Sequence, residues 1–133
     1  MNMSEIINRE TKKEHMIGKK NWIISDGFMS STEKGKYVSH EAVCVLNISG
    51  ETANIDISIY FEDGSPLKGF KAVCENERTN HIRLDKLKNE NGDIIPREVP
   101  YAIKVESDVP IVVQHSRMDV SQAEMTLMTT IAY

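Results

Sequence analysis

The chain has 133 residues, 40% of them hydrophobic, and a formal net charge of −4. This size fits one domain that buries about two thirds of the surface its unfolded chain exposes. The sequence has no apolar segment near the roughly 20 residues of a membrane span and no hydrophobic signal-peptide region. We therefore predict a cytoplasmic protein.

The charge is unevenly spread along the chain. Residues 1–20 hold five Lys or Arg and three Asp or Glu, which leaves a net charge of −6 for residues 21–133. Nucleic-acid binding rests on neutralising phosphates with basic side chains, so an acidic body disfavours it. A role as a weak DNA-binding regulator remains an alternative only if the basic N-terminal tails of an oligomer supply the positive charge.

The chain divides into a flexible polar extension, residues 1–16, and one folded domain, residues 17–133. The extension is too polar to bury much of a helix. Cys44 and Cys74 fall inside apolar runs without the spacing of a metal site, which indicates two buried thiols in a reducing compartment. No cofactor is predicted.

Short strand patterns follow from Trp22 onwards. Ile55, Ile57 and Ile59 alternate with polar residues, which is the pattern of an antiparallel strand with one face in the core. Turns are predicted at residues 25–27 and a flexible loop at residues 29–36. The predicted strands cover residues 22–24, 39–47, 54–61, 70–74, 78–84, 101–106, 111–117 and 126–133.

The polar end of the strand at residues 111–117 is the main functional signal. With a side-chain period of two, His115 and Arg117 share a face with Ile111 and Val113, and Gln114 lies on the other face. Polar groups at the end of an apolar strand lie at the rim of a core, where ligands usually bind. Residues 107–110 are predicted to link this strand tightly to residues 101–106, as its neighbour.

Together these patterns predict an all-β single domain, an antiparallel β-sandwich of about seven to eight strands. A small sheet protein also has strand edges to cover, and symmetric association is one common way to cover them. A homo-oligomer is therefore expected.

The chain resembles the sensory rhodopsin transducer family from Ile17 to Tyr133. The resemblance lies in I-G-x-x-x-W at 17–22, S-H-E-A-V-C-V-L-N at 39–47, R-T-N-H-I-R at 78–83, and S-D-V-P-I-V-V-Q-H-S-R-M-D-V-S-Q-A-E at 107–124 with T-T-I-A-Y at 129–133. It implies a small sandwich that assembles as a cyclic homotetramer. It also implies a non-enzymatic role, either in relaying a signal from a membrane photoreceptor or in binding a small, sugar-like metabolite.

The chain departs from the family pattern in two places, each of which could form a surface for a protein partner. The chain carries the extension at residues 1–16, and its first loop reads D-G-F-M-S-S where the family often has an acidic residue, glycine, an aromatic residue and proline.

The polar positions that match the family motifs form the predicted ligand site: Trp22, Ser39, His40, Glu41, Arg78, His81, Gln114, His115, Arg117, Asp119 and Gln122.

Several of these residues also fit other roles. His40, His81 and His115 could converge on a metal, and His115 with Glu41 or Asp119 could act as a general base for Ser39 or Ser116, although no catalytic signature surrounds them. Arg117 could simply pair with Asp119, and Trp22 could be a core residue instead of a platform for a sugar. The sequence favours binding of a small polar ligand, with a protein-interaction relay as the alternative.

Overall fold

The computed structural model describes residues 2–5, 17–32, 37–122 and 124–133. The extension predicted at residues 1–16 therefore falls mostly outside the described residues. Every strand pairing is antiparallel, which confirms the predicted fold class. The elements are β1 (Lys19–Gly27), β2 (His40–Asn47), β3 (Ala53–Phe61), β4 (Leu67–Cys74), β5 (Arg78–Arg83), the 3₁₀ helix η1 (Leu84–Lys86), β6 (Tyr101–Asp119) and β7 (Thr126–Ile131).

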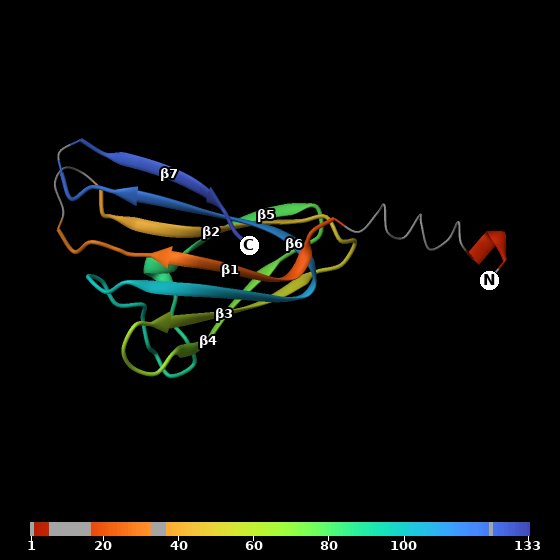
Figure 1. Ribbon diagram of the computed structural model, residues 1–133, viewed down its shortest axis with the longest axis horizontal. Helices are drawn as coiled ribbons and strands as arrows, with labels where there is room; N and C mark the ends of the chain where they lie inside the picture. Colours follow the sequence, from red (N-terminus) through yellow and green to blue (C-terminus); the bar gives the residue numbers. More distant parts are fainter. Residues whose placement is uncertain (1, 6–16, 33–36, 123) are drawn as a thin grey trace.

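Strand β6 organises the fold. It is 19 residues long, and it doubles back at one end of the molecule so that its two halves lie in different layers (Figure 1). The first half pairs with β1 and β3, and β4 extends that layer beyond β3. The second half pairs with β2 and β7, and β5 extends the other layer beyond β2. The layers are thus one strongly curled sheet that is continuous through β6.

The prediction that residues 101–106 and 111–117 form two neighbouring strands is wrong, because both belong to β6 and pair with different partners. Pairing with β3 reaches Ser107, and pairing with β2 begins at Val112. Pro110, which has no N–H to donate, is tolerated because it lies where the strand changes partners. Asp108 holds the bend by accepting hydrogen bonds of 2.8 Å from the backbone N and from Nδ2 of Asn54.

The core lies between the two layers. Ile55, Ile57 and Ile59 of β3 are at most 1% exposed and belong to one hydrophobic cluster with Val43 and Val45 of β2. The core face predicted for residues 54–61 is therefore confirmed, whereas Ser58 on the opposite face, predicted to be in water, is buried at 7% exposed. No helix in the described ranges is long and apolar enough to cross a membrane.

The first long loop is more ordered at its start than the sequence suggested. Residues 25–27, predicted as a turn, complete β1. Met29 is 1% exposed, and its carbonyl oxygen accepts a 2.8 Å hydrogen bond from the backbone N of Glu98. The Glu98 carboxylate accepts one of 2.7 Å from the backbone N of Ser31, the main cause of its lowered pKa. The prediction of a flexible loop is thus wrong for residues 29–32, while 33–36 lie outside the described residues.

An ion-pair cluster fastens the same loop to η1. Arg83 donates two hydrogen bonds of 2.8 Å to the Asp85 carboxylate. Arg97 donates two more of 2.8 Å, to the carbonyl oxygens of Ser30 and Ser39. Burial alone would raise the pKa of Asp85, but the hydrogen bonds and charge of Arg83 outweigh it, so this pKa lies below its usual value.

The Asp85 cluster predicts a loss of stability in acid. A carboxylate whose folded pKa is lowered stabilises the fold above its unfolded pKa, about 3.9, and this contribution disappears as pH falls through the folded pKa. Asp85→Asn should therefore reduce the free energy of unfolding at pH 7 and flatten its decline below about pH 4. Urea unfolding across this pH range measures both effects. Asp63→Asn, in an exposed turn, is the control, and an Asp85→Asn curve parallel to that of the wild type would contradict the assignment.

Candidate functional site

A buried carboxylate lies at the centre of the candidate site. The Glu41 side chain is on the core face of β2 and is fully buried. Its Oε1 accepts a 2.8 Å hydrogen bond from the backbone N of Phe28 and another from the hydroxyl of Tyr101. Its Oε2 contacts Nε2 of His115 and accepts a 3.3 Å hydrogen bond from Nε of Arg117. Four donors thus compensate the loss of water around this charge.

Two partners of Glu41, Tyr101 and Arg117, have pKa values shifted by their surroundings. Burial first, and then the charge of Glu41, raises the pKa of Tyr101 far above its usual value, so its hydroxyl remains a donor. Burial would lower the pKa of Arg117, but Glu41 and then Asp26 outweigh this and raise it. We assign the proton of His115 to Nε2, which faces the carboxylate. Nδ1 then faces Thr130 Oγ1 at 3.5 Å.

This cluster opens to solvent through what we call the Arg117 cavity, about 270 Å³ in volume. Arg117 Nη2 lies 3.3 Å from the carbonyl oxygen of Asp26 and 3.5 Å from its Oδ1, so both contacts are long. Guanidinium has five N–H donors, and long contacts of this kind are readily exchanged for a ligand. The cavity is lined by Ile23, Ile24, Ser25, Asp26, His115, Arg117, Met128, Thr130, Ile131 and Tyr133.

Trp22 is a core residue, as one of its two predicted roles required. Its side chain is 9% exposed, and Nε1 donates hydrogen bonds of 2.9 Å to the carbonyl oxygens of Lys19 and Ile111. Lys19 Nζ lies 4.6 Å from the Trp22 ring centroid and 4.7 Å from that of Tyr133. Tyr133 is further fixed by a 2.8 Å hydrogen bond from its N to the Ile23 carbonyl oxygen. The exposed aromatic ring at the Arg117 cavity is therefore that of Tyr133.

The structure divides the predicted ligand site between two faces of one layer. Cys44 pairs with His81 on one side and Gln114 on the other, and these three residues lie on the outer face. They border a separate hollow of about 160 Å³. His115 pairs with Val43, whose side chain is in the core. Because His81 and His115 point to opposite faces, the alternative of a three-histidine metal site is wrong.

The remaining predicted residues have local roles. Ser39 Oγ accepts a 2.9 Å hydrogen bond from the backbone N of Val120, and Asp119 Oδ1 accepts one of 2.7 Å from that of Ser121. Arg117 thus pairs with Glu41 and Asp26 and not with Asp119. The other three lie away from the Arg117 cavity: Arg78 donates to the Glu77 carbonyl oxygen, His40 contacts that of Val38, and Gln122 is exposed.

The arrangement gives no support to a nucleophile. Ser116 pairs with Ala42 and lies 3.6 Å from Cys44 Sγ on the outer face, opposite to His115. The Ser39 hydroxyl is engaged by Val120. Neither serine is therefore placed for His115 to accept its proton.

Three residues whose side chains contact Glu41, His115 or Arg117 were not predicted as site residues from the sequence. Asp26 was interpreted as part of a turn, and Thr130 as an ordinary strand residue. Tyr101 begins the run of core-facing residues that continues with Ile103 and Val105. A buried tyrosine usually needs a hydrogen-bond partner for its hydroxyl, and this is the signal that could have found it.

The fold and the cluster define a class of small antiparallel sandwich with a buried carboxylate beneath an open polar cavity. The family model described as Anabaena sensory rhodopsin transducer matches residues 17–133. The chain belongs to this family, which confirms the resemblance noted in its sequence.

Two solved structures are similar over most of their length. Thermotoga maritima 1070 is 42% identical, with 89% of this chain and 96% of that chain covered and a TM-score of 0.79. The structure titled Anabaena sensory rhodopsin transducer is 36% identical, with 77% and 90% covered and a TM-score of 0.69. No curated protein matches the chain significantly.

Proposed function

We propose that this protein is a non-enzymatic, cytoplasmic transducer that binds a small polar metabolite in the Arg117 cavity. The observation that carries the proposal is the position of Arg117 and His115, which contact the buried Glu41 on one side and line an open cavity on the other. Membership of a transducer family supports a signalling role over turnover. Binding would then report the metabolite through the buried cluster.

The lining of the cavity favours a sugar-like ligand. Arg117 supplies donors, while the Asp26 carboxylate and Nδ1 of His115 supply acceptors, and a polyol needs both. Ile23, Ile24 and the exposed ring of Tyr133 form an apolar wall against which C–H groups of a sugar can pack. Arg78, His81 and Gln114, predicted with this site, are not part of the cavity lining.

Native mass spectrometry of the freshly isolated protein tests the ligand directly, since it detects a retained small molecule. We expect a bound sugar-like species, and a panel of monosaccharides and polyols should contain one that raises the melting temperature. Arg117→Ala should weaken that ligand about tenfold or more, because a charge-assisted hydrogen bond contributes about 1.5–3 kcal/mol. Arg78→Ala removes an arginine outside the cavity and should leave the affinity unchanged. Equal effects of the two substitutions, or no stabilising compound, would contradict the proposal.

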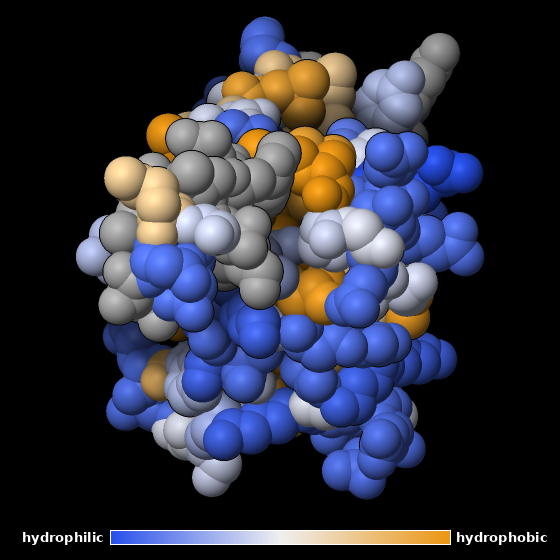
Figure 2. Space-filling model, turned by 90° about the vertical axis from the view of Figure 1, so that its right-hand side faces the viewer, coloured by the Kyte–Doolittle hydropathy of each residue, from blue (hydrophilic) through white to orange (hydrophobic). Residues whose placement is uncertain are grey.

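The same measurement reports subunit number, for which we propose a cyclic homotetramer. All six residues of β7 are exposed, with Leu127 at 70% and Ile131 at 84%. The register places both on the outer face beside Met118 and Gln114. Seen from the end where β6 bends, hydrophobic surface gathers in the upper part, the side of the layer that contains β7, while the lower part is mostly hydrophilic (Figure 2). A second copy covering this face would bury that surface; a monomeric mass would argue against it.

A protein-interaction relay is the second candidate, favoured by the family match. In this role a membrane receptor would be the partner, and the loops of the sandwich would carry the contact. A pulldown from membranes with the full chain and with residues 1–16 removed tests it. Capture of a membrane receptor by the full chain would support the relay, and its absence in both cases would count against it.

A further inference from the structure

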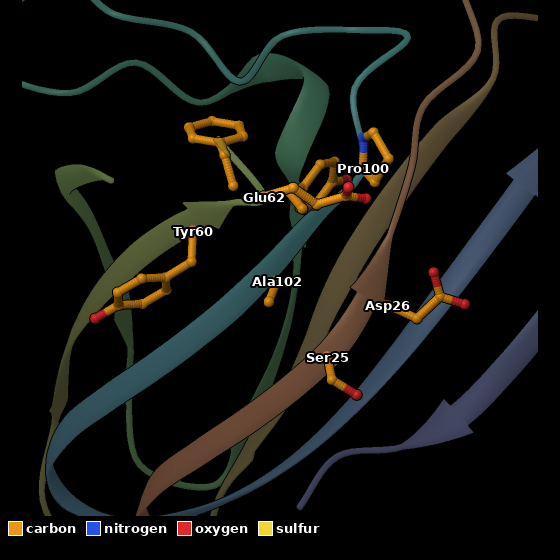
Figure 3. Close-up of a pocket in the computed structure, with 8 residues that line it drawn as sticks. Ser25, Asp26, Tyr60, Glu62, Pro100 and Ala102 are labelled. Carbon is orange, nitrogen blue, oxygen red and sulfur yellow. The ribbon is translucent and has the colours of Figure 1, made fainter. Parts of the chain in front are cut away.

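Asp26 contacts the outer end of the Arg117 guanidinium in the Arg117 cavity. Its carbonyl oxygen lies 3.3 Å and its Oδ1 3.5 Å from Nη2 of Arg117, while Nε of the same group faces the buried Glu41. In Figure 3, a close-up of the neighbouring hollow at the end of β1, the Asp26 side chain points away from Tyr60 and Ala102. It points towards the second half of β6, the strand that carries Arg117. A ligand that enters the cavity therefore meets an arginine that already has a carboxylate beside it.

The fixed charges at the cavity sum to a negative value. Among the residues that line it in the described part of the chain, Arg117 is the only lysine or arginine. This arginine faces two carboxylates, Glu41 at 3.3 Å and Asp26 at 3.5 Å. With its single proton on Nε2, His115 adds no charge. The positive charge of Arg117 is thus already matched by Glu41, and Asp26 makes the mouth of the cavity negative.

This balance of charge favours some ligands over others. Phosphate and carboxylate groups bind a guanidinium through two parallel charge-assisted hydrogen bonds, which need free donors on one edge of the arginine. In this cavity Glu41 and Asp26 contact those donors. An anion would have to displace Asp26 and would then remain close to two carboxylates, which repel it. A hydroxyl carries no charge, and it can accept a hydrogen bond from Arg117 while it donates one to Asp26.

We propose that Asp26 makes the Arg117 cavity selective for uncharged polyols, such as free sugars, over phosphorylated or acidic sugars. This inference rests on the proposed metabolite site and names its substrate class. Asp26 has two effects: it accepts a hydrogen bond from a hydroxyl of the ligand, and it excludes anions from Arg117.

Inorganic phosphate tests the exclusion of anions without knowledge of the metabolite. Two-dimensional NMR at constant pH and ionic strength follows the Nε–H signal of Arg117 and the amide signals of Asp26 and Thr130. For the wild type we expect no saturation by phosphate at millimolar concentration. Asp26→Asn keeps an oxygen acceptor without the charge and should bind phosphate about fivefold more tightly, because it removes the competing ion pair and the repulsion. Saturation of the wild type, or no gain in Asp26→Asn, would overturn the proposal.

Two further variants assign the gain to the contact between Asp26 and Arg117. Asp63→Asn removes the same charge from an exposed turn outside the cavity, and should gain no phosphate binding. Adding Arg117→Gln to Asp26→Asn should abolish the gain, because Arg117 is the group that Asp26 shields. Equal gains in Asp26→Asn and Asp63→Asn would reflect net charge alone and would overturn the role of Asp26.

Matched sugars separate this inference from the metabolite proposal. Each monosaccharide of the stabilisation panel is compared with its phosphate ester and its sugar acid. The neutral member should raise the melting temperature of the wild type most, and Asp26→Asn should narrow the difference. If the phosphate ester stabilises the wild type as well as the neutral sugar does, the selectivity is wrong although a metabolite binds. If no member stabilises the protein, the metabolite proposal fails and the selectivity with it, whereas the phosphate titration decides separately whether Asp26 excludes anions.

Discussion

Replacement of Glu41 by alanine is expected to cost about 3–5 kcal/mol of folding free energy. The substitution leaves Arg117, His115 and the hydroxyl of Tyr101 without their shared acceptor, in a place where water cannot fully replace it. Removing one partner of a buried charge cluster is costly because the other groups stay buried and unpaired. Urea unfolding measures the loss as a lower midpoint with an unchanged slope.

Two further variants separate this explanation from a general sensitivity of the sheet. Glu41→Gln retains an acceptor for Tyr101 but lacks the charge that Arg117 requires, and should fall between the wild type and Glu41→Ala. Glu106→Gln, on the exposed face of β6, should change the free energy of unfolding by about 0.5 kcal/mol or less. A loss below about 1 kcal/mol for Glu41→Ala would mean that the cluster is already hydrated in the folded state.

Gly27→Ala is expected to disrupt the same cluster by displacing the Tyr101 ring, and to lower the free energy of unfolding by about 3 kcal/mol. A Cβ at this position would lie 2.7 Å from Cδ2 and 2.9 Å from Cζ of Tyr101, closer than atoms can approach. The Tyr101 ring is 3% exposed and is held by Glu41, so it cannot move without breaking that hydrogen bond. The free-energy costs of overpacking and of losing a hydrogen bond to a charged group therefore add.

Amide hydrogen exchange at Phe28 checks this mechanism, because its backbone N–H is bonded to Glu41. Exchange there should accelerate in Gly27→Ala together with the loss of stability. Tyr101→Phe removes only the hydroxyl, and should cost about 1–3 kcal/mol. If Gly27→Ala folds with wild-type stability, the ring has room to move and the coupling between Gly27 and Glu41 does not exist.

The alternation of side chains was predictable because a strand has a period of two whatever surrounds it. This alone placed Ile55, Ile57 and Ile59 on one face of their strand, and separated His115 and Arg117 from Gln114. Local signals of a turn were misleading at residues 107–110, where a proline and two polar residues were interpreted as a link between neighbouring strands. Whether such a bend ends a strand depends on the partners of each half, and those partners are distant in sequence.

The membership of the site was only partly predictable for the same reason. Glu41, His115 and Arg117 were predicted and do converge. Tyr101 and Asp26 complete the cluster from other strands, and no local pattern shows that their strand ends meet it. His81 and Gln114 carry the same polar signal as His115, yet they lie on the outer face.

By itself, the amino-acid sequence determined the all-β class, the core faces of β3 and of the second half of β6, and the family, since these follow from alternation and from collinear motifs. The tertiary structure alone decided that one strand, β6, belongs to both layers, and that the buried carboxylate of Glu41 lies beneath the Arg117 cavity. The physical reason is that faces are set by neighbours along the chain, whereas contacts across a sandwich are set by strand register and by the bend that brings two layers together.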